Sequence, residues 1–461
     1  MPRKTLVKNG YLPRLVDEQI ERYLEVFGAV EVAGTKWCGK TWTALAHAQS
    51  VSYVDEELDM ARADPKLMLI GDRPHVIDEW QLAPAIWNAV RHAIDDERGL
   101  RGAWLLTGSS TPISSDDQEG QSRHSGAGRI GSVRMYPFSL AESGESERSV
   151  SLRGLFAHRF QPAKVENDTR QLAELICRGG WPEALDLSAE NGQLVAREYL
   201  RLVFEKSAPK HGKSGEVARR LCLSIARNLG QSPTYKTIIS DMYGGEDNPS
   251  SLVTEQTLAS YLEFLRSIYL VEEVPGWVPP KRSKKRLATK PKRYFADPSW
   301  AAALLLLSPD SLLADGQTFG LVFENLCIRD LKVYAQAMDP SMPAAVYYYR
   351  DDSGLEADAV IETLDGRWAA FEFKLSEEKV PDAVKSLRRL RKKVAENPRA
   401  QGRPPEFLCV ITGIGSYARD EYRTTLAGPC IIYYRYNATT LTVYRIMHQR
   451  QSIDTYSLVE Y

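Results

Sequence analysis

The chain has 461 residues, of which 43% are hydrophobic, and this length predicts roughly two to four domains that each bury a core. The formal net charge is −1, which excludes a strongly basic protein, so any affinity for nucleic acid must come from a local cluster of charge. The six cysteines include no C-x-x-C pair, and the longest apolar run, at 300–307, is too short to cross a bilayer. We therefore expect a cytoplasmic protein without zinc, disulfides, a signal peptide or a membrane partner.

An amphipathic helix is expected within residues 11–28, followed by a short buried strand at 29–33. Arg14 is a candidate for approaching a nucleotide, although an ordinary surface position is the simpler interpretation. The strand leads into the pattern G-x-x-x-x-G-K-T, and a helix is expected from Trp42 onward. This context is typical of the phosphate-binding loop of P-loop nucleotide hydrolases, here formed by Gly34, Thr35, Lys36, Trp37, Cys38, Gly39, Lys40 and Thr41.

The residue types in this loop predict how it binds ATP and Mg²⁺. The two glycines allow backbone N–H groups to face the phosphates, and the N-terminus of the following helix adds a favourable dipole. Lys40 would reach the β- and γ-phosphates, and the hydroxyl group of Thr41 would ligate Mg²⁺. We therefore expect ATP and Mg²⁺ as the cofactors.

The next strands are expected at 51–55 and 75–79, and the second of them ends in two carboxylates. Asp78 would hold Mg²⁺ and Glu79 would polarise the water that attacks the γ-phosphate, whereas an exposed acidic turn is the alternative. A further strand is expected within 103–110, and it ends in small polar residues. Ser109 or Thr107 is the candidate there for sensing the γ-phosphate and orienting the water, unless the strand simply runs into a turn.

Residues 111–128 are rich in Ser, Gly, Asp and Gln, and this composition predicts a surface loop. The loop leads to Arg129 and a strand-like segment at 133–138. An arginine in this place is a candidate for stabilising transition-state charge, either within the subunit or across the interface of a homo-oligomer. A solvated loop arginine is the alternative.

The motifs G-x-x-x-x-G-K-T, I-D-E at 77–79, L-L-T-G-S-S at 105–110, G-R at 128–129, P-F-S at 137–139 and G-G-W-P-E at 179–183 resemble those of bacterial and archaeal AAA-type ATP-binding proteins. The resemblance implies an α/β fold class with four parts. These are a P-loop AAA-type ATPase core (1–148), a helical connector (149–212), a winged helix-turn-helix (213–305) and a C-terminal domain of unknown function (306–461) that is similar to restriction-endonuclease-like folds.

The residues of the middle region agree with a winged helix. A polar linker is expected at 205–215, then helices around 221–229 and 237–241 and a longer helix from Thr254, whose side chain is suited to capping. A strand at 268–274 precedes basic residues at 281–286 and 290–293, which would grip the phosphates of DNA or RNA. The alternatives are a solvated loop or a protein-docking module.

The C-terminal region carries a second possible chemistry. Asp358, followed by Glu372 and Lys374, matches the D…E-x-K pattern of restriction-like nucleases, in which two carboxylates hold Mg²⁺ and a lysine assists cleavage. Glu324, on a helix that starts near residue 319, is a further candidate. Ala357 replaces the usual proline, so the match is partial. A basic helix is expected at 381–396, and it faces either DNA or, as the alternative, only solvent. The surrounding elements are strands at 345–350, 356–361, 367–374, 410–413 and 430–434.

These observations lead to one main hypothesis and two alternatives. The first is a Mg²⁺-dependent ATPase that acts on, or is regulated by, nucleic acid, with Glu79, Lys40, Ser109 and Arg129 as catalytic candidates. The second is an ATP-gated, metal-dependent nuclease. The third is a non-enzymatic switch that holds ATP and docks a protein partner.

Overall fold

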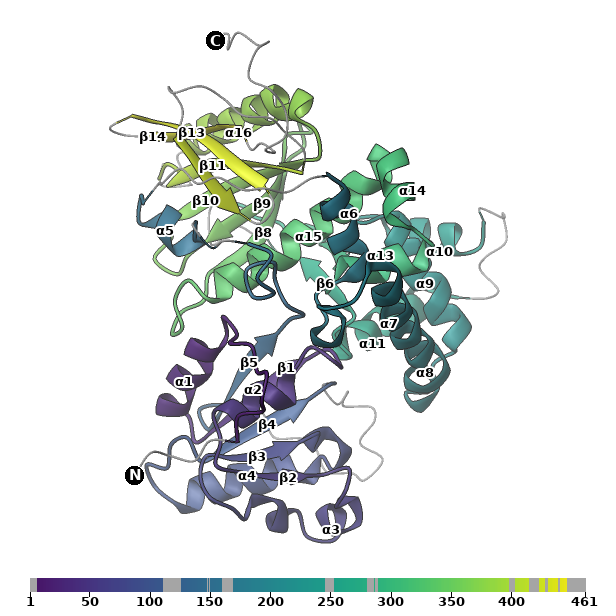
Figure 1. The fold of residues 1–461 in the computed structure, drawn as a ribbon, viewed down its shortest axis with the longest axis vertical. Coiled ribbons are helices and arrows are strands. Elements are labelled where there is room, and N and C mark those ends of the chain that lie inside the picture. Colours follow the sequence, from purple (N-terminus) through teal and green to yellow (C-terminus); the bar gives the residue numbers. More distant parts are fainter. Residues whose placement is uncertain are drawn as a thin grey trace.

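The computed structural model describes residues 6–110, 126–146, 148, 150–159, 169–244, 253–279, 286, 289–397 and 403–413, and the backbone of three further strands up to residue 445. An N-terminal α/β unit, a helical middle part and a C-terminal α/β unit follow one another along the chain (Figure 1). No helix in these ranges has both the length and the hydropathy that a membrane span requires.

The N-terminal unit is built on a five-stranded parallel sheet in the order β2-β3-β4-β1-β5. Its strands are β1 (Ala29–Gly34), β2 (Ser50–Tyr53), β3 (His75–Asp78), β4 (Trp104–Gly108) and β5 (Ile130–Met135), and its helices are α1 (Asp17–Val26), α2 (Lys40–Ala46), α3 (Leu58–Ala63) and α4 (Ala85–Asp96). Alternate strand residues face two separate hydrophobic clusters, so both faces of the sheet are buried. Because all five strands are parallel, the ends of β1, β3 and β4 meet at one edge.

The middle part begins with α5 (Leu152–Phe156), α6 (Thr169–Arg178), α7 (Ala189–Leu202), a π-helical turn (Val203–Ser207) and α8 (Ala208–Lys210). The polar linker predicted at 205–215 is therefore wrong over its first half, which continues the path of α7. The segment is helical because it is anchored by buried side chains: Val203 and Ala208 are 3% and 0% exposed and belong to the main hydrophobic core. The helix-breaking residues of this segment predict a loop and do not indicate that Val203 and Ala208 are buried.

The remainder of the middle part contains α9 (Gly215–Arg227), α10 (Tyr235–Met242), α11 (Glu255–Ser267), the antiparallel pair β6 (Val271–Val274) and β7 (Lys292–Phe295), α13 (Pro298–Leu304) and α14 (Pro309–Ala314). Side chains of Thr234 and Thr254 cap the N-termini of α10 and α11. Three helices followed by a two-stranded hairpin is the order predicted for a winged helix, and the identity of this region with that fold remains a prediction.

The C-terminal unit is a seven-stranded mixed sheet in the order β12-β13-β14-β11-β10-β9-β8. Its elements are α15 (Gly316–Gln336), β8 (Ala345–Arg350), β9 (Glu356–Glu362), β10 (Trp368–Lys374), α16 (Val380–Ala395), β11 (Phe407–Thr412), β12 (Arg423–Ala427), β13 (Cys430–Asn437) and β14 (Thr440–Arg445). Phe323 of α15 shares a hydrophobic cluster with Phe371, whereas Leu387 of α16 shares another with Ala370. Helices α15 and α16 thus cover different faces of the sheet.

The predicted basic surface at 281–286 and 290–293 is wrong for Arg286, Lys292 and Arg293, whereas Lys290 is exposed as expected. Lys292 and Arg293 are 3% and 5% exposed, and their cationic groups contact carboxylates of Glu356 (2.7 Å) and Glu273 (3.2 Å). Arg286 likewise pairs with Glu362 at 3.0 Å. Residues 281–285 lie outside the described residues. Acids distant in sequence neutralise these cations, which the local charge pattern does not reveal.

Candidate nucleotide-binding site

The loop between β1 and α2 is tightly curled. Gly39 has a φ of 96°, which favours glycine, and Trp37 also has a positive φ of 65°. Gly34 is required for a different reason, because a Cβ atom there would lie 2.4 Å from the carbonyl oxygen of Met135 on β5. Lys40 is only 5% exposed, and its ammonium group donates to the carbonyl oxygen of Thr35 at 2.7 Å. The lysine side chain thus lies across the loop.

The end of β3 lies directly beside this loop. The hydroxyl group of Thr41 donates to Asp78 Oδ1 at 2.8 Å, and the hydroxyl group of Thr107 on β4 donates to the same oxygen at 2.5 Å. Burial raises the pKa of Asp78, against the opposing effect of these two hydrogen bonds. A hydroxyl and a carboxylate that meet in this way are the hard oxygen donors that Mg²⁺ prefers.

Glu79 follows at once and has its own set of partners. Its Oε2 atom accepts from the hydroxyl group of Ser109 at 3.1 Å and from the side-chain amide of Gln81. The same amide donates to Ser109 Oγ at 3.2 Å, so the three side chains form a closed group. Gln81 was missed by sequence reasoning. Its position two residues after Glu79, in the turn Trp80–Leu82, was the available signal.

The hydroxyl group of Thr35 is buried inside the loop and has no hydrogen-bond partner within the described part of the chain. Most buried hydroxyl groups are satisfied, so a buried group without a partner needs an explanation. A phosphate oxygen bound in the loop would accept a hydrogen bond from this hydroxyl group. The buried hydroxyl group of Thr35 is therefore consistent with nucleotide binding by this loop.

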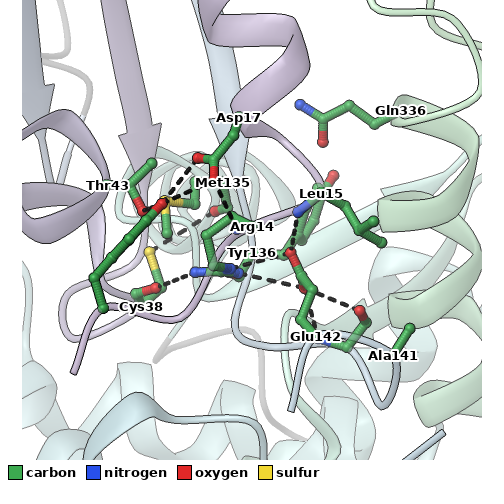
Figure 2. Close-up of polar contacts among 12 residues, drawn as sticks. Arg14, Leu15, Asp17, Cys38, Thr43, Met135, Tyr136, Ala141, Glu142 and Gln336 are labelled. Atoms are coloured by element: carbon green, nitrogen blue, oxygen red, sulfur yellow. Dashed lines mark hydrogen bonds and ion pairs between the residues drawn. The ribbon is translucent and has the colours of Figure 1, made fainter. Parts of the chain in front are cut away.

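Arg14 is buried rather than at the surface, so the surface interpretation is wrong. Its guanidinium group pairs with Glu142 at 3.0 Å and donates at 2.8 Å to the carbonyl oxygens of Cys38 and Tyr136 (Figure 2). Burial alone would raise the pKa of Glu142, but the attraction of Arg14 and hydrogen bonds, including one from the Ser139 amide, hold it below its usual value. Arg14 therefore ties the phosphate loop to the segment after β5.

The structure does not bring Arg129 to the site. Arg129 precedes β5, whose first residue, Ile130, pairs with Ala29 at the start of β1, whereas the phosphate loop follows the end of β1. Its guanidinium group instead pairs with Asp95 at 2.8 Å on the surface. The predicted role within the same subunit is therefore wrong, because parallel strands place their two ends at opposite edges. The role across an oligomer interface remains a prediction.

The phosphate loop also contacts the helical middle part. The ring of Trp37 lies edge-on to the ring of Tyr199 on α7, with a centroid distance of 5.4 Å, and Tyr199 hydrogen-bonds to the backbone of Lys36. Tyr199 stacks in turn on Trp300. Pro182 approaches Gly39 from the same side, since a Cβ atom there would lie 3.4 Å from its ring. The conformation of the loop and the position of α7 are thus physically linked.

A second polar cluster lies in the C-terminal unit. Lys374 Nζ contacts Glu372 Oε2 at 2.5 Å and Asp358 Oδ2 at 3.3 Å, and the backbone N–H of Phe373 donates to Asp358 at 2.7 Å. The structure therefore brings the predicted trio together. Burial and the nearby Asp358 charge raise the pKa of Glu372 to about 8, although Lys374 opposes them.

Glu324 joins this cluster through Lys292, which the D…E-x-K pattern did not include. Lys292 Nζ lies 3.3 Å from Glu324 Oε1 and 3.9 Å from Asp358 Oδ1. Burial and the Asp358 charge raise the pKa of Glu324 to about 7, although Lys292 opposes them. Across the described residues, no group of three or more acidic, histidine or cysteine side chains is arranged to hold a metal ion. The carboxylates of this cluster face ammonium groups instead.

Comparisons with known families agree with the division of the chain. Residues 27–144 match the AAA domain family, residues 169–311 match a domain of unknown function (DUF8612), and residues 319–430 match another domain of unknown function (DUF4143). No curated protein matches the chain. The restriction-endonuclease-like assignment of the C-terminal domain receives no support from these matches.

Solved structures give weaker similarities. A Walker-type ATPase of Pyrococcus abyssi is 14% identical, with 66% of this chain and 99% of that chain covered and a TM-score of 0.41. The ORC1 protein of Aeropyrum pernix, solved in complex with DNA, is 14% identical over 65% of this chain and 93% of that chain, with a TM-score of 0.23. The ORC2 protein of Aeropyrum pernix is 11% identical over 72% of this chain and 99% of that chain, with a TM-score of 0.20. The family match over residues 27–144 therefore carries the conclusion that the N-terminal unit is similar to AAA-type P-loop domains.

Proposed function

We propose that the protein binds ATP in the loop of residues 34–41 and hydrolyses it. The observation that carries this proposal is the meeting of Thr41, Asp78 and Glu79 at one edge of the sheet, beside the buried ammonium group of Lys40. A triphosphate needs a cation and backbone amides around it, and hydrolysis needs a base that reaches water next to the γ-phosphate.

Each side chain of the site has a defined task in this proposal. Lys40 neutralises charge on the β- and γ-phosphates, and Thr41 and Asp78 would hold Mg²⁺. The metal, when bound, withdraws charge from the phosphate oxygens. Glu79 accepts a proton from the attacking water. Ser109, with Gln81, holds the carboxylate of Glu79 in one orientation, and Thr107 does the same for Asp78.

The replacement Lys40→Ala tests the assignment. We expect the variant to keep its circular dichroism spectrum and to lose ATP turnover. The other lysine of the loop, Lys36, is exposed, so its ammonium group does not replace the buried one of Lys40. Lys66→Ala, which removes an exposed lysine of the same unit, should hydrolyse ATP at the wild-type rate. Hydrolysis that is undiminished in Lys40→Ala would refute the site.

We further propose that nucleic acid acts as a regulator or substrate of this ATPase and that helix α16 contributes to binding it. The helix exposes Lys385 and Arg389 on its outer side, where they can approach phosphates, and the exposed Lys392 beside them lies 3.8 Å from Glu396. The test is the ATPase rate with and without DNA or RNA at several salt concentrations. Stimulation that weakens as salt rises supports the proposal, and a slow rate that DNA never changes favours the protein-docking switch.

A metal-dependent nuclease is the second candidate function. The convergence of Asp358, Glu372 and Lys374 favours it, because phosphodiester cleavage uses carboxylates that hold a metal and a cation beside them. Plasmid DNA incubated with the protein, Mg²⁺ or Mn²⁺, and ATP provides the test. Nicking that disappears in Asp358→Ala supports this function, whereas intact plasmid under all conditions counts against it.

A further inference from the structure

The cluster around Asp358 contains a lysine that comes from another part of the chain. Lys292 lies on strand β7, in the hairpin of the middle part, and its ammonium group enters the C-terminal unit. It contacts Glu356 at 2.7 Å, Glu324 at 3.3 Å and Asp358 at 3.9 Å. Only 3% of Lys292 is exposed. A positive charge is therefore already present among these carboxylates.

Other residues of the middle part close the same side of the cluster. The hydroxyl group of Tyr294, also on β7, donates to Glu324 at 2.6 Å. Gly230, in the turn between α9 and α10, lies so close that a Cβ atom there would be 2.5 Å from Glu324 Oε1. Tyr348 donates at 2.5 Å to the carbonyl oxygen of Lys290, just before β7. The hairpin and this turn thus cover Glu324 and its neighbours.

This arrangement conflicts with a metal site that is open for reaction. A divalent cation needs several carboxylate oxygens that converge without an ammonium group between them. Here, Lys292 lies between Glu324, Glu356 and Asp358, and Lys374 bridges Asp358 and Glu372. A nucleic-acid strand also needs an exposed surface, whereas Asp358 and Glu372 are 9% and 5% exposed.

We propose that Lys292 is an internal counter-cation that keeps this carboxylate cluster closed to divalent metal, and that displacement of the β6–β7 hairpin opens it. The proposal rests on the second candidate function and names how that site is regulated. It makes the hairpin an autoinhibitory element of the C-terminal unit. With the lysine withdrawn, Glu324, Glu356 and Asp358 lose their shared cation and attract a metal in its place.

A continuous set of contacts joins this hairpin to the nucleotide-binding loop. Glu272 on β6 pairs with Arg134 on β5 at 2.7 Å, and the next residue of β5, Met135, has its carbonyl oxygen against Gly34. Strand β6 pairs with β7, so that Val274 lies opposite Lys292. Movement of the phosphate loop and β5 therefore has a physical route to the lysine.

The test is Mn²⁺ binding to the full-length protein, measured by electron paramagnetic resonance with the metal alone. We expect Lys292→Met to bind Mn²⁺ at least roughly ten-fold more tightly than the wild type, because it leaves the carboxylates without their shared cation. Lys236→Met, which removes an exposed lysine of α10, should behave as the wild type. Adding Asp358→Asn to Lys292→Met should abolish the gain.

A folded Lys292→Met variant with wild-type ATP turnover and unchanged Mn²⁺ affinity would overturn the proposal. If this variant does not fold, Glu272→Gln serves instead, because it weakens the pairs of the hairpin with Arg134 and Lys332 and replaces no residue of the cluster. Tighter Mn²⁺ binding by Glu272→Gln supports the closure, and unchanged binding rejects it. Tight Mn²⁺ binding by Lys292→Met without plasmid cleavage supports the closure and rejects only the nuclease.

Discussion

Glu79 has a left-handed backbone conformation, with a φ of 56°, at the point where β3 ends. Such a conformation is unfavourable for a side chain other than glycine and persists only where the surroundings fix it. Two contacts do so here, because the backbone N–H of Glu79 donates to Thr107 Oγ1 at 3.1 Å and its carboxylate accepts from Ser109. The proposed general base is thus oriented before any substrate binds.

Removing the Ser109 hydroxyl group should therefore impair catalysis more than binding. We expect Ser109→Ala to lower kcat for ATP by about 10- to 100-fold, the range given by losing one hydrogen bond to a charged group. The KM for ATP should stay within about two-fold, since Ser109 contacts the base and not the loop. Ser110→Ala, the neighbouring replacement, should leave both constants unchanged. A higher KM with unchanged kcat would contradict the positioning role.

The residues of this site differ in how well sequence reveals them. Lys40, Thr41, Asp78 and Glu79 belong to short motifs with fixed spacing, so their convergence was predicted. The ion pair of Arg14 is not predictable in this way, because its carboxylate partner, Glu142, lies 128 positions further along the chain and belongs to no motif. A local pattern states what a side chain can do, but a partner that distant depends on the folded chain.

At the scale of elements, one buried ion pair ties the segment just before α1 to the phosphate loop and to the segment after β5. Arg14 and Glu142 have side chains that are 2% and 1% exposed. Glu142 also accepts hydrogen bonds from the backbone N–H groups of Leu15 and Ser139, both at 2.9 Å. The pair thus fixes three stretches of backbone against the loop.

We expect Arg14→Met to lower the free energy of unfolding of the N-terminal unit by roughly 3–5 kcal/mol, because the buried Glu142 carboxylate loses its cation. Arg22→Met is the control, since Arg22 on α1 has a side chain that is 48% exposed and pairs with Glu25 at the surface. Thermal unfolding followed by circular dichroism measures both. Equal melting temperatures for the two variants would show that the pair does not stabilise the unit.

Sequence patterns were reliable for elements with regular periodicity and poor for segments judged by composition. Strands β1 and β3 and helix α16 lie within a few residues of their predictions. The breaker-rich segment at 205–215 is partly helical, and the basic residues Lys292 and Arg293 are buried. Composition describes the average surroundings of a residue type, whereas burial at these positions is decided by packing against other parts of the chain.

At the scale of the whole molecule, one carboxylate connects three parts of the chain. Glu272 of β6 pairs with Arg134 of β5 at 2.7 Å and with Lys332 of α15 at 2.6 Å. Burial would raise the pKa of Glu272, but the attraction of these two cations outweighs it and lowers the pKa to about 2. The N-terminal unit, the hairpin and the C-terminal unit therefore share one ionic junction.

This junction predicts how stability depends on pH. The pKa of Glu272 is lowered on folding from 4.5 to about 2, so its contribution is fully present above pH 4.5 and is lost as the pH falls towards 2. Wild-type protein should therefore exceed Glu272→Gln in stability by a few kcal/mol near neutral pH, on the order expected for such a shift. The difference should shrink as the solution is acidified.

Melting temperatures between pH 7 and pH 3 measure this difference. Glu25→Gln, which alters an exposed carboxylate of α1, should follow the wild type throughout. A gap between the wild type and Glu272→Gln that stays constant with pH would show that Glu272 is not held ionised by Arg134 and Lys332.

The ionic junction also bears on how the protein is made. Translation proceeds from the N-terminus, and early parts of a polypeptide fold while later parts are still being synthesised. Arg134 is synthesised 138 residues before Glu272, its partner in the ion pair. Gln336, whose side-chain amide donates to the carbonyl oxygen of Arg134, is synthesised 202 residues after Arg134. The nascent N-terminal unit is therefore expected to reach its final form only when most of the polypeptide has been translated.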